Sequence, residues 1–108
     1  MRGKQLRSNL DRLEQRVLTG PGVVSPAHRQ AAASGQALGG EMDDYLQKVR
    51  SHAYRVTDEE VAALRAAGAS DDELFELTVS AALGAAKSRL GAGLAAVAAV
   101  YGEDEKQK

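Results

Sequence analysis

The chain has 108 residues and a formal net charge of −1, with 44% hydrophobic residues, three Tyr and one Phe as its aromatic residues, and no cysteine. This length suits one domain with a modest core built from Leu, Val and Ala. The absence of cysteine excludes disulfides, thiolate metal sites and thiol catalysis, and is typical of a cytoplasmic protein. No secretory signal is expected, because the basic start is not followed by an apolar segment. The longest apolar run, residues 90–102, is too short to span a bilayer.

The charges are unevenly distributed along the chain. Residues 1–18 contain five basic and two acidic side chains, whereas residues 41–76 contain ten acidic and four basic ones. A basic N-terminal arm is one sign of nucleic-acid binding, but here the bases surround an apolar stripe and have no aromatic residues among them. We therefore expect a solvated helix face and no nucleic-acid partner.

The first half of the chain predicts three helices. An N-terminal amphipathic helix within residues 1–18 has one apolar stripe, a seam suited to packing against other helices. Ser25-Pro26 is typical of a helix start and predicts a short Ala-rich helix that continues to residue 38 and is ended by Gly39-Gly40. Residues 41–54 predict a third helix with one apolar face. The stripe of the first helix is Leu6, Leu10, Leu13 and Val17; the face of the third is Met42, Tyr45, Leu46 and Val49.

The second half repeats one start signal, first as TDEE at 57–60 and then as SDDE at 70–73. A Ser or Thr followed three residues later by Glu satisfies free amides at a helix start, so each copy predicts a cap. The first helix covers 57–67 and ends before Gly68. The second runs from 71 to about 101, with an apolar face that begins at Phe75, and residues 103–108 form a charged tail. Because no segment alternates with the period of a strand, the predicted class is all-α, with about five helices in one domain over 1–102.

Small residues recur every fourth position on the last helix, at Ser80, Gly84, Ser88, Ala92 and Ala96. Such a ridge allows another helix to approach closely. The partner is either a helix of the same chain or a neighbouring subunit, and the sequence favours neither. Together with the N-terminal seam, the ridge offers more contact surface than a chain of this size covers alone, so we expect a homo-oligomer.

A family resemblance follows from residues 56–97, VTDEEVAALRAAGASDDELFELTVSAALGAAKSRLGAGLAAV. This segment resembles the closing helices of the alkylhydroperoxidase/carboxymuconolactone decarboxylase (AhpD-like) family, in which an apolar helix ends in an Arg-Leu pair, here Arg89-Leu90. Residues 25–38, SPAHRQAAASGQAL, are similar to the preceding helix of its peroxidase-related branch. The resemblance covers residues 25–97 and implies a compact helical domain with a C-terminal helical hairpin, assembled as a trimer or hexamer.

The chain departs from that family at its hallmark, Cys-x-x-Cys-x-x-x-His. Aligned on Gly68, the motif places Ala53 and Val56 at the two cysteine positions and Glu60 at the histidine. Because thiol peroxidases need a nucleophilic thiolate, that chemistry is excluded. The decarboxylase and isomerase branches use general acids and bases instead and remain open.

The candidate catalytic residues are His52, Tyr54 and Glu76, and Arg55 and Arg89 are candidates for binding a substrate. An imidazole titrates near neutrality, and a carboxylate among helices can act as an acid. The alternative favoured by the sequence is that His52 is structural or exposed and that Glu76 pairs with Arg89. No spacing suggests a metal site or a cofactor.

Two functions are compatible with this sequence. One is a thiol-free member of the family that binds or acts on a small organic molecule, such as a carboxylate, between helices. The other is a non-catalytic helical module for oligomerisation or partner docking that has lost the family's redox chemistry. Whether the protein is an enzyme stays open.

Overall fold

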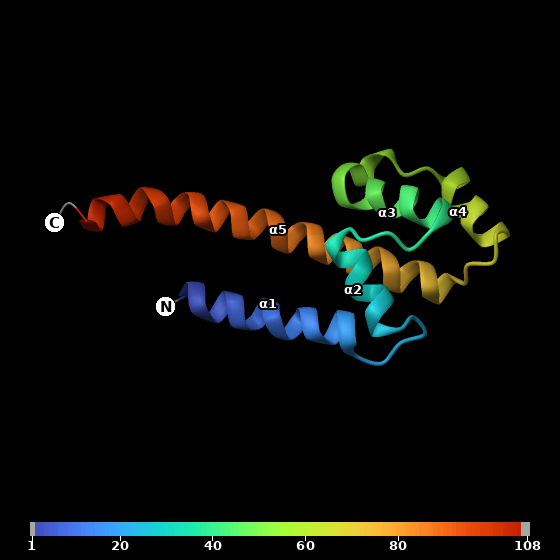
Figure 1. Cartoon of the computed structure of the whole chain (residues 1–108), viewed down its shortest axis with the longest axis horizontal. Helices are drawn as coiled ribbons and strands as arrows, with labels where there is room; N and C mark the ends of the chain where they lie inside the picture. Colours follow the sequence, from blue (N-terminus) through green and yellow to red (C-terminus); the bar gives the residue numbers. More distant parts are fainter. Residues whose placement is uncertain (1, 107–108) are drawn as a thin grey trace.

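The computed structural model describes the backbone of residues 2–106 and the side chains of Gln5 and residues 8–101. Within residues 2–106 helices are the only regular secondary structure, which confirms the all-α prediction. Its elements are α1 (Arg2–Thr19), α2 (Pro26–Ser34), α3 (Gly40–His52), the 3₁₀ turn η1 (Ala53–Arg55), α4 (Asp58–Ala66) and α5 (Asp71–Lys106). Helices α2 to α4 and the first half of α5 form a body, and α1 runs beside the second half of α5 (Figure 1).

The two repeated start signals cap helices as predicted. The Thr57 hydroxyl accepts a hydrogen bond from the backbone N–H of Glu60 at 3.2 Å, and the Ser70 hydroxyl accepts one from Glu73 at 3.1 Å. Gly68 adopts a φ of 109° at the corner between the helices, a conformation that favours glycine. The short α4 contacts α3, and this corner connects it to α5.

Helix α2 ends earlier than predicted, at Ser34 instead of residue 38. Gly35 takes a left-handed conformation with φ 80°, and its N–H caps the helix by donating to the carbonyl of Ala31. The next turn is held by Asp43, whose carboxylate accepts from the N–H of Leu38 at 2.6 Å and of Gly39 at 2.8 Å. The first glycine of the region therefore ends α2, and Gly39 precedes α3 as its N-cap residue.

The core lies between α2, α3, α4 and the first half of α5. Its buried residues are Val24, Ala32, Tyr45, Leu46, Val49, Leu64, Leu74, Leu77 and Ala81. The prediction that Phe75 begins the buried face of α5 is wrong, because Phe75 is 68% exposed. Helices α2 and α3 both pack on the face of α5 that contains Leu74, Leu77 and Ala81. Phe75 is the next residue after Leu74, so its side chain points about 100° away from that face.

Helices α2 and α5 approach closely at Gly84. A Cβ at this position would lie 2.7 Å from the carbonyl carbon of Ala33 and 2.8 Å from its Cα. Ser80, on the same ridge, is fully buried, whereas Ser88, Ala92 and Ala96 are exposed. The first half of the predicted small-residue ridge thus packs within the chain.

Helix α5 is longer than predicted and extends past the body. It continues to Lys106, so residues 103–106 belong to the helix, and residues 107–108 of the predicted tail lie outside the described residues. The molecule measures 62 × 29 × 20 Å, and the end of α5 projects beyond the start of α1 (Figure 1). Lys87 of α5 joins the two helices by contacting Glu14 and Asp11 of α1, the latter at 3.6 Å.

Candidate functional site

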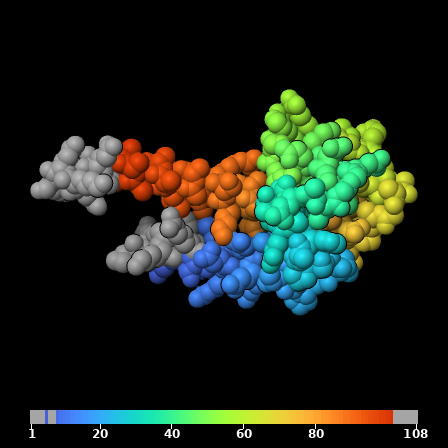
Figure 2. All heavy atoms as spheres, in the orientation of Figure 1, coloured from blue at the N-terminus to red at the C-terminus, as the bar shows by residue number. Residues whose placement is uncertain are grey.

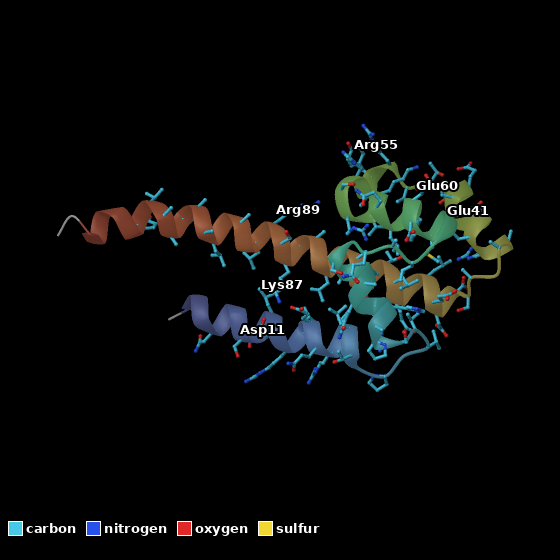
Figure 3. All side chains as sticks on the ribbon, viewed as in Figure 1. Asp11, Glu41, Arg55, Glu60, Lys87 and Arg89 are labelled. Atoms are coloured by element: carbon cyan, nitrogen blue, oxygen red, sulfur yellow. The ribbon has the colours of Figure 1, made fainter. Side chains whose placement is uncertain are left out.

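The structure brings three of the five candidate residues together, at the end of α3 and in η1. His52 and Tyr54 meet edge to face with their ring centroids 5.9 Å apart, and the Arg55 guanidinium lies 5.7 Å from the centroid of the Tyr54 ring. All three are exposed, Tyr54 by 80%, and Arg55 points away from the body (Figure 3). Solvent surrounds these groups, so they are not desolvated in the way that catalytic acids and bases usually are.

Glu76 is engaged elsewhere. Its two carboxylate oxygens accept hydrogen bonds from the backbone N–H groups of Val23 at 2.9 Å and Val24 at 3.1 Å. These bonds hold the pKa of Glu76 below its ordinary value. The expected ion pair with Arg89 is wrong, because Arg89 donates to the carbonyl of Arg50 at 2.6 Å. An ionised carboxylate that binds two amides of the α1–α2 loop fastens that loop to α5.

Arg29 is a structurally important residue that the sequence analysis missed. Its side chain is 2% exposed and donates to three backbone carbonyls, those of Val24 at 3.0 Å, Val17 at 2.7 Å and Gly20 at 2.5 Å. The guanidinium therefore ties the end of α1 to the loop and to α2. The sequence did contain a signal for this role. Apart from His28, Arg29 is the one basic residue in a short helix made mostly of small residues.

A large open groove of about 1130 Å³ lies between α1, α2 and α5. Its lining is mostly small or apolar, including Leu18, Ala31 and Leu83, with Gly84, Gly91 and Ala92 along α5. Its charged lining residues are Glu14, Arg50, Lys87 and Arg89. It therefore lies away from the His52, Tyr54 and Arg55 cluster, and among the candidate residues it includes only Arg89.

The charges of the groove fall into two groups. Lys87 is satisfied by Glu14 and Asp11 of α1, and these contacts raise its pKa. Arg50 donates to the carbonyl of Ala32 at 2.9 Å and to the side chain of Gln47 at 2.9 Å. Among the described residues neither Arg50 nor Arg89 pairs with a carboxylate, so one end of the groove has two guanidinium groups. This arrangement suits binding of an anion.

A second feature is the apolar surface of the distal half of α5. The distal seam, which we define as Leu90, Leu94, Val97 and Tyr101, lies on a segment without a charged residue from 90 to 101. Val97 is 52% exposed and Tyr101 65%, and Leu13 of α1 is 47% exposed. Figure 2 shows this segment projecting from the body. A pocket of about 280 Å³ between α1 and α5 is lined by Leu10, Leu90 and Leu94.

The predicted seam of α1 is only partly covered. Leu10 and Val17 are half-buried, Leu13 is largely exposed, and Leu6 lies outside the residues whose side chains are described. Among the side chains of α1 that the structure describes, Leu18 is the buried one, and it lies one position beyond the predicted stripe. Leu10 of the α1 seam and Leu90 and Leu94 of the distal seam therefore line one apolar pocket.

By length and composition, α5 qualifies as a candidate membrane span over Asp71–Tyr101. The apolar window that meets this test is not buried within the chain, whereas Leu74, Leu77 and Ala81 at the start of the helix are buried in the body. The uncharged remainder, residues 90–101, rises about 18 Å along the helix axis, short of the roughly 30 Å of a bilayer core.

Among the described residues, no group of three His, Asp or Glu residues is arranged to hold a metal ion. Comparison of the chain with protein-family models, curated proteins and solved structures found no match.

Proposed function

We propose that the protein is a non-catalytic helical module that assembles with copies of itself through α1 and the distal half of α5. The observation that supports this function is the exposed distal seam. Apolar side chains at a 4-3-4 spacing on a helix are typical of a surface that packs against other helices. The groups with catalytic chemistry, in contrast, are either exposed, as His52 is, or bound to backbone amides, as Glu76 is.

The exposed apolar side chains supply a driving force for association. Full burial of a large apolar side chain stabilises by about 1.5–3 kcal/mol, and Leu13, Val97 and Tyr101 of each copy, which are 47–65% exposed, would each gain about half of that. For two copies the total is comparable to the lower part of an association cost of roughly 4–15 kcal/mol. The half-buried Leu10, Leu90 and Leu94 lie in the same surface and add to the contact area.

The test is the molar mass in solution, measured by light scattering and sedimentation at micromolar concentration. The wild-type chain should be an oligomer, and Val97→Asp should shift it to the monomer. Phe75→Asp is the matched control, because Phe75 is an exposed apolar residue of the same helix on the body, outside the distal seam. A wild-type monomer, or an equal effect of the two substitutions, would refute the proposal.

A second candidate function is binding of a small organic acid in the groove. It is favoured by the two guanidinium groups of Arg50 and Arg89 beside an apolar lining that includes Leu18 and Leu83. A carboxylate would contact the guanidinium groups, and an apolar body would contact the lining. The resemblance of residues 25–97 to the alkylhydroperoxidase/carboxymuconolactone decarboxylase family, which stays a prediction, is compatible with such a ligand.

Calorimetric titration with benzoate and with hexanoate tests this candidate. Binding that is lost in Arg89→Ala and kept in Arg55→Ala would place the acid in the groove. Binding that depends on Arg55 would place it at the η1 cluster instead. If neither acid binds the wild-type protein, the module has no ligand of this class, and self-association is unaffected by that result.

A further inference from the structure

Helix α1 is fastened firmly to the body at its C-terminal end. Arg29 donates to the carbonyls of Val17 and Gly20, at the last turn of α1 and just beyond it. Glu76 accepts from two amides of the loop that follows. The buried side chain in the described part of α1, Leu18, lies at the same end. The rest of the helix lies against α5 with few buried apolar contacts, which is typical of an element that opens separately from the body.

Two hollows lie between α1 and the rest of the chain. The groove of about 1130 Å³ is lined on the α1 side by Glu14 and Leu18. The pocket of about 280 Å³ is lined on that side by Leu10 and Asp11. Lys87 of α5 lines both hollows, so it lies between them. Its ammonium group contacts Glu14 and Asp11, the latter at 3.6 Å (Figure 3). We call this set of contacts the Lys87 latch, because it joins the middle of α1 to α5 where the two helices are loosely packed.

The latched helix covers apolar surface of α5. Leu90 and Leu94, the first two residues of the distal seam, are half-buried and line the pocket together with Leu10 of α1. Val97 and Tyr101, the other two residues of the seam, are 52% and 65% exposed. Movement of α1 away from α5 would therefore expose apolar side chains of both helices at once.

We propose that α1 is a hinged arm, held on α5 by the Lys87 latch, and that its opening uncovers Leu10, Leu90 and Leu94 for a second copy. The end of α1 that Arg29 binds stays on the body, and the helix before it swings outward. The closed arm is an autoinhibitory contact, because α1 and a second copy compete for the same residues of α5. This inference rests on the proposed self-association and adds the contact that regulates it.

Amide hydrogen exchange tests the arm, in a Val97→Asp background that disables the distal seam. Lys87→Gln removes the charge of the latch and should raise the exchange rates of residues 8–16 several-fold, as expected for a partly exposed group of ion pairs. Residues 74–83, in the body, should keep their rates. Lys48→Gln is the matched control, because Lys48 pairs with Glu60 at 2.7 Å on the body and is 42% exposed, against 44% for Lys87.

The control should leave α1 unchanged, although it alters the net charge equally. Equal rates for residues 8–16 in all three proteins would overturn the arm. Exchange of α1 and the body together, in one unfolding step, would overturn it as well.

Ionic strength provides a second measurement of the latch. In about 1 M salt the Debye length is about 3 Å, so exposed ion pairs are screened. The exchange of residues 8–16 in the protein that keeps Lys87 should rise with salt toward that of Lys87→Gln. A difference between the two proteins that persists unchanged at high salt would contradict a charged latch.

Sedimentation of the same substitutions in the wild-type background tests the regulation. Lys87→Gln should lower the dissociation constant of the assembly several-fold, and Lys48→Gln should not. If Lys87→Gln frees α1 without strengthening association, the autoinhibitory contact is wrong while self-association stands. A wild-type monomer that assembles only as Lys87→Gln supports the latch and contradicts assembly of the unaltered chain. If both proteins stay monomeric, the regulation and the proposed function are both wrong.

Discussion

Gly84→Ala tests the closest helix contact of the body. An alanine is normally the better residue within a helix by about 1 kcal/mol, so on propensity alone this substitution stabilises. Here the added Cβ would lie 2.7 Å from the carbonyl carbon of Ala33 and 2.8 Å from its Cα, where ordinary contact begins at 3.4 Å. All the atoms it meets belong to the α2 backbone, so no side chain can rotate away. Helices α2 and α5 must separate.

The expected cost follows from what that separation disrupts. Ala32 of α2 and Ala81 of α5 have no exposed area, so the two helices are already tightly packed there. Overpacking of a well-packed core typically costs about 1–3 kcal/mol, and a clash of backbone with backbone belongs at the upper end. With the propensity gain subtracted, Gly84→Ala should destabilise by about 2 kcal/mol. The melting temperature should then fall by roughly 10 °C.

Urea unfolding followed by circular dichroism measures this change at one fixed protein concentration, because association would otherwise shift the midpoint. The matched control is Gly91→Ala, on the same helix, where an added Cβ meets nothing within 4 Å. That variant should gain about 1 kcal/mol. If Gly84→Ala were as stable as the wild type, or if both alanines stabilised equally, the close approach of α2 and α5 would be refuted.

Three further substitutions test other parts of the structure. Ser70→Ala removes the α5 cap and should cost about 1 kcal/mol in urea unfolding, and an unchanged midpoint would contradict the cap. Arg29→Met leaves three carbonyls without their donor and should cost about 3 kcal/mol, whereas Arg12→Met, at an exposed position, should cost little. Because the pKa of Glu76 is lowered by folding, its stabilisation is complete above the ordinary value of 4.5 and is lost as pH falls through the lower folded value. Glu76→Gln should therefore be less stable at neutral pH and lose less stability on acidification, and parallel pH curves would contradict this.

The helices were largely predictable because their signals are local. A hydroxyl followed by Glu at Thr57 and Ser70 determines a cap through atoms a few residues apart, so neighbouring sequence is sufficient. The end of α2 was predicted wrongly because a helix can end at either Gly35 or Gly39. Which glycine ends it depends on Asp43, which lies eight residues beyond Gly35 and binds the turn between the helices. The buried face of α5 depends on where α2 and α3 pack, which periodicity alone does not reveal.

The site residues were harder to predict, since their roles depend on partners distant in sequence. Glu76 is an isolated acid in an apolar stretch by sequence, and only the fold brings it to Val23 and Val24, more than 50 residues earlier. Arg50 was not a candidate, although it meets Arg89 at the groove. In contrast, the preference for a structural or exposed His52 agrees with its exposed position. Patterns of residue type indicated where helices lie but not which polar groups meet.

The projecting end of α5 should also make local unfolding and proteolysis of the chain depend on protein concentration. Residues 95–101 are exposed, and an isolated helical stretch of that length is marginally stable in water. In a dilute, unassembled chain this end should open readily, exchange its amide hydrogens quickly and be cut by proteases, while the body remains protected. Assembly would slow both processes at the distal helix alone. Protease sensitivity of this one segment would thus report whether the proposed assembly has formed.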